Sequence, residues 1–364
     1  MHIPSLLLAV LSHSLVAAQK STPSLSGAPI DLTGNNVGSA YPRANYLSNG
    51  NILAAYTAFP PGTNNQVLTL VTSSDNGLTW SRTGTAASKS IAAGTLDNPY
   101  PFQLPSGRIL LAFRNHDIDS AGKFVYYRIT LSYSDDLGAN WKYLSDAMIV
   151  DASPDFENGI WEPLMRLGVD GTLQMYYSHE RAAEDQDNVY LTSADGGATW
   201  SKTEIPVSGS NHNGRDGMVG VAGIREGNGT NLIAVFETNT NAGPFSIYAV
   251  SSSNGGATWT NRRLVYTAST TGRHAGAPQV VNVGGTLVVS FMTDEDVAAS
   301  SWNWPIVAAS KMLVSVDGGL TWKNKLQVFA PNSQWPSLLA LRDEDAFLYL
   351  TSQGNVKAQK VTLS

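Results

Sequence analysis

Short apolar segments alternate with polar turns along most of the chain. In the first clear unit, residues 41–47 are mainly apolar, a Ser-Asn-Gly turn follows, and a second apolar segment covers residues 52–59. A third segment, residues 67–73, leads into another turn. Alternating and β-branched residues between Gly, Asn and Asp turns are the signal of β-hairpins. The pattern therefore predicts a meander of short strands.

The same order of segments returns five more times. Each later unit begins with an apolar segment, continues through a turn to a second strand and ends near a third. The paired segments are 98–104 with 109–115, 161–167 with 173–179, 218–224 with 232–238, 278–283 with 287–293, and 335–341 with 346–350. A final segment covers residues 356–361. Each unit predicts about four strands, and six such units fit in the chain.

An eight-residue box closes five of these units. It first reads Ser-Ser-Asp-Asn-Gly-Leu-Thr-Trp, and its tryptophans follow one another roughly every sixty residues, which indicates an array of one repeated unit. The five tryptophans are Trp80, Trp141, Trp200, Trp259 and Trp322. Radial repetition of four-stranded sheets predicts an all-β, six-bladed β-propeller. A solenoid would require capping repeats, which the sequence does not contain.

The last unit is one strand short and has no box. We expect the segment around Ile30 to supply that strand and to close the ring, so that residues 19–364 form one catalytic domain. Within the box, the Asp side chain can bond the N–H groups of its own turn, and Gly accepts positive φ. The Trp ring is then buried with its N–H bonded. Calcium binding is the alternative, but the terminal Glu of an EF-hand loop is missing.

The box also indicates which face of the propeller carries chemistry. It lies between the third and fourth strands of a unit, and the turns at the start of strand one and the end of strand two lie on the other face. We therefore look for functional residues at strand-one starts and strand-two ends.

Composition and charge exclude several classes of partner. The net charge is −6, charged residues are 14%, and Lys and Arg do not cluster, so neither nucleic acid nor an anionic membrane is an expected partner. Residues 6–11 are apolar and 16–18 are small, which predicts a signal peptide over residues 1–18 and secretion. The apolar run is too short to span a bilayer. There is no cysteine, and Asn228-Gly229-Thr230 is a glycosylation sequon.

Two carboxylates stand at comparable places in neighbouring units. Glu162 lies between Trp161 and Pro163 at a strand-one start, and Glu237 follows Phe236 at a strand-two end. A carboxylate in such apolar surroundings needs a partner or a proton. Glycoside hydrolysis requires a pair of this kind. A structural ion pair with Arg43, Arg114 or Arg166 is the alternative.

Further polar and aromatic residues are expected at the same face. Aromatic rings at the rim suit stacking on sugars, while arginine and histidine side chains suit bonds to hydroxyls. The candidates are Asn98, Tyr100, Trp302, Trp304 and Trp335, with Arg43, Arg114, His116, His179, Arg215 and Arg273. Each histidine is more often a hydrogen-bonded loop residue than a catalyst. No metal-ligand spacing is present, and no cofactor is expected.

The residues resemble those of known families. The boxes resemble the Asp-boxes of the sialidase superfamily, but no Asp lies between Arg43 and Asp75, and the tyrosine nucleophile of sialidases cannot be placed. Other segments are similar to fungal exo-1,5-α-L-arabinanases of glycoside hydrolase family 93. They are Leu104-Pro105-Ser106-Gly107-Arg108, Ala112-Phe113-Arg114-Asn115-His116, Gly159-Ile160-Trp161-Glu162-Pro163, Ala234-Val235-Phe236-Glu237-Thr238 and Ala275-Gly276-Ala277-Pro278-Gln279.

That resemblance implies a retaining hydrolase that releases arabinobiose from the non-reducing end of linear α-1,5-arabinan, a plant cell-wall polysaccharide. It implies Glu162 and Glu237 as catalysts, with Glu162 favoured as nucleophile and Glu237 as acid/base, about 5–5.5 Å apart. We expect a monomer. Two alternatives remain: a sialidase or other exo-glycosidase of the same fold, and a carbohydrate-binding propeller without catalysis.

Overall fold

The computed structural model describes residues 20–34, 38–225, 229–342 and 344–364. The predicted signal peptide and Asn228 of the sequon lie outside these residues. The described chain is all-β apart from two short 3₁₀ helices, η1 (Ile91–Ala93) and η2 (Ala299–Ser301). No helix in the described ranges is long and apolar enough to cross a membrane.

Four sheets of the described chain are separate four-stranded antiparallel units. The first three follow the chain order from inner to outer strand. They are β2 (Gly38–Tyr46), β3 (Ile52–Phe59), β4 (Asn65–Ser73) and β5 (Ser81–Ser90); β6 (Gly94–Gln103), β7 (Ile109–Ile118), β8 (Phe124–Ser134) and β9 (Lys142–Asp151); and β18 (Ala275–Val283), β19 (Thr286–Thr293), β20 (Ala309–Ser315) and β21 (Lys323–Phe329).

The fourth separate sheet joins the two ends of the chain. It consists of β22 (Gln334–Ala340), β23 (Ala346–Gln353), β24 (Asn355–Leu363) and, at its outer edge, β1 (Pro23–Asp31). Strand β1 pairs antiparallel with β24, from Pro23 opposite Leu363 to Asp31 opposite Lys357. The segment around Ile30 therefore supplies the strand that the last unit lacks.

The fifth sheet has eight strands instead of the two separate sheets expected here. Two antiparallel meanders form it: β10 (Ile160–Leu167), β11 (Leu173–Ala182), β12 (Asp185–Ser193) and β13 (Ile205–Ser208); and β14 (Arg215–Gly223), β15 (Leu232–Asn239), β16 (Ser246–Ser252) and β17 (Thr260–Tyr266). One parallel residue pair, Gln186 with Arg215, joins β12 to β14. The join lies beside the cavity described below.

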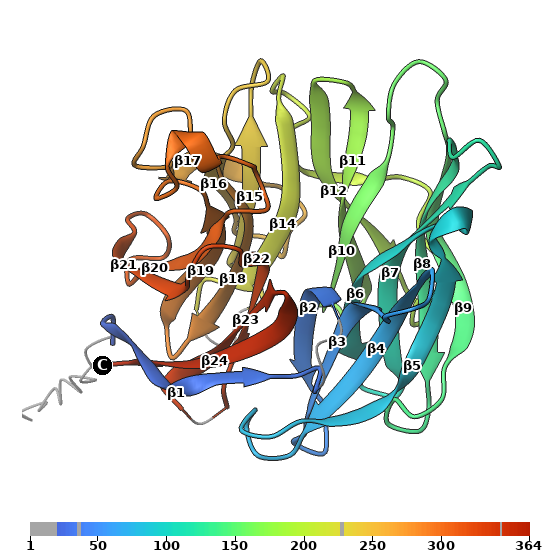
Figure 1. The fold of residues 1–364 in the computed structure, drawn as a ribbon, viewed down its shortest axis with the longest axis horizontal. Coiled ribbons are helices and arrows are strands. Elements are labelled where there is room, and N and C mark those ends of the chain that lie inside the picture. The colour runs from blue at the N-terminus through green and yellow to red at the C-terminus, as the bar shows by residue number, and fades with distance from the viewer. Residues whose placement is uncertain (1–19, 35–37, 226–228, 343) are drawn as a thin grey trace, which may run out of the picture.

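The first strand of each meander lies nearest the centre of the molecule (Figure 1). Strands β2, β6, β10, β14, β18 and β22 contact one another in this order, and β22 contacts β2, so they form a closed ring. Buried apolar side chains fill the space between neighbouring sheets, as where Ile52 and Tyr56 share a cluster with Leu348. Sheets arranged radially around a ring are the architecture of a β-propeller.

Every inner strand carries a bulge at the same place. Each pairing with the second strand shifts register there, and the first bulged residue has a left-handed backbone with φ between 50° and 56°. Five of the six are followed by proline, which lacks an N–H and is tolerated at bulges. The six residues, here called the inner ring, are Tyr41, Asn98, Glu162, Met218, Ala277 and Trp335.

The inner ring corrects the alignment expected from sequence. Arg43 lies two residues beyond the ring position, and Gly276 lies one residue before it. In the last unit, Ser352 pairs with Gln334, the residue before the bulge. At each bulge, two residues of the inner strand oppose one residue of the second strand. The extra residue displaces every later side chain by one position from regular alternation.

The boxes form compact turns, as Ser193 to Trp200 shows. The Ser193 hydroxyl accepts the Gly197 N–H at 2.8 Å and donates to Asp195 at 2.8 Å. The Asp195 carboxylate accepts the Thr199 N–H at 2.9 Å and its hydroxyl at 2.6 Å. The Trp200 ring N–H donates to the Gly197 carbonyl at 3.1 Å.

One expectation for the boxes is wrong in two copies. The ring N–H groups of Trp80, Trp141 and Trp200 are bonded, but those of Trp259 and Trp322 are buried without a partner in the described chain.

The boxes also connect neighbouring meanders. The Gly197 carbonyl accepts the Ser145 hydroxyl at 2.5 Å, and the Gly319 carbonyl accepts Nε of Arg263 at 2.8 Å.

We predict that Ser193→Ala lowers the free energy of unfolding by about 1–3 kcal/mol, because it leaves the buried Gly197 N–H without an acceptor. Urea unfolding followed by tryptophan fluorescence measures the change. The control is Ser88→Ala, at an exposed position of β5, which we expect to change stability little. Equal effects of the two substitutions would show that the turn bond contributes nothing specific.

Candidate active site

A cavity of about 210 Å³ lies on the face opposite the boxes, between the start of β10 and the end of β15. Both carboxylates singled out from the sequence, Glu162 and Glu237, line it, as does Arg215. The complete lining is Glu157, Trp161, Glu162, Glu180, Gln186, Arg215, Glu237 and Phe245. The bulge of β10 and the end of β15 therefore bring the two predicted catalysts to one place.

Glu162 is the inner-ring residue of β10, with φ 50°. A non-glycine residue in this region is strained by about 1–2 kcal/mol, so the surrounding bulge must hold it. Within the described residues, its carboxylate has no hydrogen-bond or ion-pair partner. Burial and the charge of Glu237 raise the pKa of Glu162 to about 7, although Arg114 and Arg43 oppose the rise.

Glu237 lies in β15 and reaches across to the inner strand of the next meander. Its Oε2 accepts the backbone N–H of Ala277 at 2.6 Å. A Cβ on Gly276 would lie 2.5 Å from Oε2 of Glu237 and 3.1 Å from the ring of Trp304, so only glycine leaves room for both side chains. Burial raises the pKa of Glu237 to about 7, against the Ala277 N–H and the charge of Arg215.

Two of the arginines near the carboxylates are already paired with other acids. Arg114 donates to Asp97 at 2.7 Å, and Arg215 forms a close ion pair with Glu180. Arg215 also donates to Gln186 at 3.2 Å. Neither Glu162 nor Glu237 forms an ion pair in the described chain, so the structural alternative for these residues is not supported. Both carboxyl groups of the cavity therefore have raised pKa values, and the charge of Glu237 contributes to the rise at Glu162.

Asn98 is the inner-ring residue of β6 and is 4% exposed. Neither atom of its side-chain amide has a hydrogen-bond partner in the described chain, and the same holds for one oxygen of the neighbouring Asp97. A buried unpartnered polar group costs about 1–3 kcal/mol, so it is normally matched by water or a ligand. Asn98 was predicted to contact the ligand, but it does not line the cavity that contains Glu162 and Glu237.

The opposite wall of the ring is apolar. Met218, Ala277, Met292 and Ala308 form a buried cluster, and Trp304 and Trp335 pack against it. The Trp335 ring also packs on Tyr41, with 4.8 Å between the ring centroids. Such a wall can support the apolar face of a sugar.

Trp302 lies in the loop next to this wall and is 49% exposed. Its ring N–H donates to buried Asp294 at 2.5 Å, which fixes the loop. His274 stacks on Trp302 and Trp304, with centroids 6.1 Å and 4.8 Å apart. The nearby Arg273 donates to the Val297 carbonyl at 2.9 Å and does not line the cavity.

Several predicted contacts lie elsewhere. His116 is fully buried behind Trp161, where it bonds the Ile160 carbonyl at 2.9 Å, and burial lowers its pKa to about 2. His179 pairs with Glu204 at 2.7 Å, away from the cavity. Arg43 and Tyr100 line a second cavity beyond the inner ring, so Tyr100 is not a rim residue. Arg43 and Tyr100 follow a bulge in their own strands, which alters the alternation of side chains, whereas the two histidines lie in second strands and are held by neighbouring groups.

Other cavity residues escaped the sequence reasoning. Glu180, Gln186 and Phe245 lie in strands or loops that no motif marks, and Tyr41 and Met218 of the inner ring were also missed. A signal for the ring was present, because proline follows the ring residue in five of the six units. Within the described chain, no group of three or more His, Cys, Asp or Glu residues is arranged to hold a metal.

Comparisons with protein-family models and with curated proteins found no match. Solved structures do match over most of the chain. One is the family GH93 α-L-arabinofuranosidase of Fusarium graminearum in complex with arabinobiose, at 23% identity and a TM-score of 0.69, covering 92% of this chain and 96% of that one. Another is the α-L-arabinanase of Penicillium chrysogenum with arabinobiose, at 19% identity and a TM-score of 0.67, covering 95% and 98%.

A sialidase also matches, the K499G mutant of NanB from Streptococcus pneumoniae, at 13% identity and a TM-score of 0.59, covering 94% of this chain and 70% of that one. At these identities the likeness establishes the fold, which is an all-β, sialidase-like propeller. Function has to be argued from the site, because one fold carries many activities.

We predict that Glu237→Gln stabilises the protein at pH 8 by about 1–3 kcal/mol but not at pH 4. The pKa of Glu237 is about 7 in the folded protein, above its ordinary value of 4.5. Between these values the unfolded chain releases the proton first, so rising pH lowers the stability of the parent. Glutamine stays neutral and avoids this loss.

Thermal unfolding at both pH values measures the difference. Glu184→Gln, at an exposed position between β11 and β12, is the matched control, and we expect it to follow the parent. If Glu237→Gln were no more stable than the parent at pH 8, the carboxylate would not be destabilised by its surroundings.

Proposed function

We propose that this protein is a secreted, retaining exo-glycoside hydrolase that releases arabinobiose from the non-reducing end of linear α-1,5-arabinan. The observation that carries the proposal is the pair Glu162 and Glu237, which line one cavity with pKa values raised to about 7. The α-L-arabinofuranosidase and the α-L-arabinanase with similar folds, both solved in complex with arabinobiose, support the choice of sugar. The motif resemblance to family 93 supports it independently.

The proposed propeller has six blades. The ring of six inner strands and the repeated bulge support this number, because each four-stranded meander contributes one strand and one bulge. The eight-stranded sheet then counts as two blades, which only one residue pair connects. The repeated turns with their Ser, Asp and Trp bonds support the assignment of Asp-boxes.

In the proposed mechanism Glu162 is the nucleophile. The positive charges of Arg43 and Arg114 favour its ionised form, although neither forms an ion pair with it. One Glu162 oxygen attacks the anomeric carbon as the bond to the leaving oxygen breaks. Glu237 gives its proton to that oxygen, which releases the shortened chain and leaves a glycosyl ester on Glu162.

Water completes the reaction. Glu237, now ionised, removes a proton from a water molecule, and the water oxygen attacks the same carbon. The ester bond breaks, arabinobiose leaves with its anomeric configuration retained, and both carboxyl groups return to their starting states. The Ala277 N–H and the glycine at 276 fix Glu237 for both proton transfers.

The shape and polarity of the site support an exo-acting enzyme. The cavity is small. On another side of the inner ring, Trp304 and Trp335 pack against a buried apolar cluster. Asn98, buried with an unpartnered amide, is suited to the hydroxyls of a terminal sugar. A chain end fits such a site better than the middle of a polymer.

The alternatives are less well supported. A sialidase needs free arginines for the carboxylate of sialic acid, whereas Arg114 and Arg215 are paired with Asp97 and Glu180. A binding propeller has no use for two costly carboxyl groups in one cavity. We also infer a monomer that is exported and processed before Gln19.

We expect protein recovered from the culture medium to begin at Gln19 and to convert linear α-1,5-arabinan to arabinobiose alone. Thin-layer chromatography with mass spectrometry identifies the product. Glu162→Gln and Glu237→Gln should each lower kcat at least about 10³-fold without unfolding the protein. A ladder of oligomers, turnover of a fluorogenic sialoside instead, or binding without turnover would each contradict the proposal.

Azide should separate the two roles. In Glu237→Ala, azide can attack the glycosyl ester on Glu162, so we expect a glycosyl azide with retained configuration and a rise in rate. In Glu162→Ala, azide takes the place of the nucleophile, and the product should have inverted configuration. The substrate is an arabinobioside with an activated aryl leaving group, and NMR reports the configuration. The opposite pair of outcomes would exchange the assignments.

A further inference from the structure

A second cavity, of about 280 Å³, lies along the axis of the molecule beyond the inner ring. All six inner strands contribute to its lining, so we call it the axial cavity. Representative residues from the strands are Arg43, Tyr100, Leu164, Val221, Gln279 and Ser337. None of its lining residues is shared with the cavity that contains Glu162 and Glu237.

Arg43 is the one charged residue that lines the axial cavity in the described chain. It is 8% exposed, and its Nη1 donates to the Pro42 carbonyl at 2.8 Å. No carboxylate among the described residues lies within ion-pair distance. Burial lowers the pKa of Arg43 to about 10. A buried cation without a counter-ion is costly, and proteins normally pair it.

Two further polar side chains in this cavity are without partners. Ser337 is 2% exposed, and its hydroxyl has no hydrogen bond in the described chain. Gln279 also lines the cavity, and its side-chain amide makes no hydrogen bond to the described residues. A hydroxyl and an amide N–H can both donate to an anion beside the guanidinium. The rest of the lining is mainly apolar.

We propose that the axial cavity binds one small monovalent anion of the halide class, held by the Arg43 guanidinium and the Ser337 hydroxyl. A single positive charge matches a single negative one, whereas sulfate or phosphate would leave an unpaired charge in apolar surroundings. Binding would neutralise Arg43, and the guanidinium would then act less on Glu162 across the inner ring. The axial cavity shares no lining residue with the cavity that contains Glu162 and Glu237, and it would bind an anion instead of a sugar.

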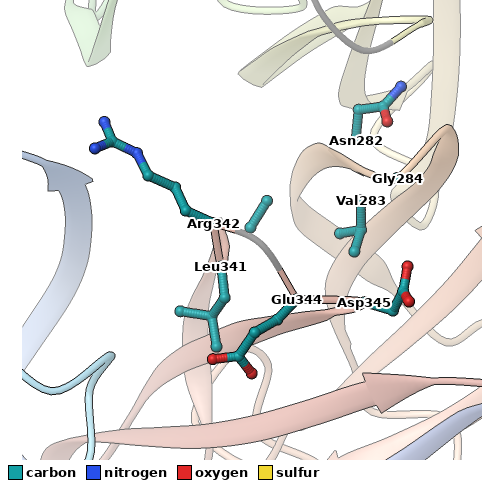
Figure 2. A pocket seen from close by; sticks show the side chains of 8 residues that line it. Asn282, Val283, Gly284, Leu341, Arg342, Glu344 and Asp345 are labelled. Atoms are coloured by element: carbon teal, nitrogen blue, oxygen red, sulfur yellow. The ribbon is translucent and has the colours of Figure 1, made fainter. Parts of the chain in front are cut away.

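The axial cavity adjoins a pocket on the box face, away from the cavity that contains Glu162 and Glu237. Asn282 and Ala340 line both the axial cavity and a pocket of about 330 Å³ between the β18–β19 and β22–β23 turns. Figure 2 shows Arg342 of this pocket pointing away from Glu344 and Asp345. Those two acids are paired with Lys360 and Lys20, each at 2.5 Å, so their charge toward an approaching anion is reduced.

Bromide tests the site directly, because its anomalous scattering distinguishes it from water. Crystals of the parent protein soaked in sodium bromide should show one anomalous peak in the axial cavity, at hydrogen-bond distance from Arg43 and Ser337. Crystals of Arg43→Met should lose this peak, whereas Arg82→Met, at an exposed position of β5, should keep it. An empty or water-filled cavity in the parent, or an unchanged peak in Arg43→Met, would overturn the proposal.

Thermal unfolding gives a second readout that needs neither crystals nor substrate. At equal ionic strength, the parent and Arg82→Met should melt at a higher temperature in sodium bromide than in sodium gluconate, whose anion is too large for the cavity. Arg43→Met should show no such difference, and Ser337→Ala, which keeps the cation, should show a smaller one. A parent that does not distinguish the two salts would contradict halide binding, whatever sugar the enzyme cleaves.

Discussion

The bulge of the inner strands is the constraint on which the remainder of the structure depends. At six equivalent places a non-glycine residue adopts a left-handed backbone, and each such residue is strained by about 1–2 kcal/mol. The bulge interrupts the alternation of side chains along each inner strand, and Glu162 and Asn98 occupy two of these positions. Without it, six regular strands would meet as a continuous apolar core, and the molecule would have no place for a polar site at its centre.

The opposite face compensates for this strain. There the repeated turns satisfy their own polar groups, and their glycine carbonyls accept bonds from the neighbouring meander, as Gly197 does from Ser145 and Gly319 from Arg263. The residues that stabilise the ring are therefore separated from those that act in it. Because of this separation, the six inner-ring positions can hold different residue types, from tyrosine to alanine, while the sequences of the five boxes are nearly the same.

The regular part of the architecture could be predicted from sequence, because turns and alternating strands are local. The repeats predict the box, the strand order and the closing strand near Ile30. They also predict that Glu162 and Glu237 lie in one cavity. The misplaced residues follow from the bulges. A register shift is invisible to alternation, so Arg43 was assigned to the catalytic face and Tyr100 to the rim, although both line the axial cavity. Buried histidines such as His116 were misjudged because burial depends on packing between sheets.

The fold also places two chemically identical carboxyl groups in different surroundings within one cavity. Glu162 and Glu237 have similar raised pKa values, and each disfavours charge on the other when both are ionised. Their neighbours differ, however. The charges of Arg114 and Arg43 act on Glu162, whereas the charge of Arg215 acts on Glu237, which also accepts the Ala277 backbone N–H. When one proton is lost, repulsion between the two carboxylates disfavours loss of the second, so the pair can hold one charged and one protonated group. Because Arg43 lines the axial cavity and its charge lowers the pKa of Glu162, an anion bound in the axial cavity would change the electrostatics of the proposed site.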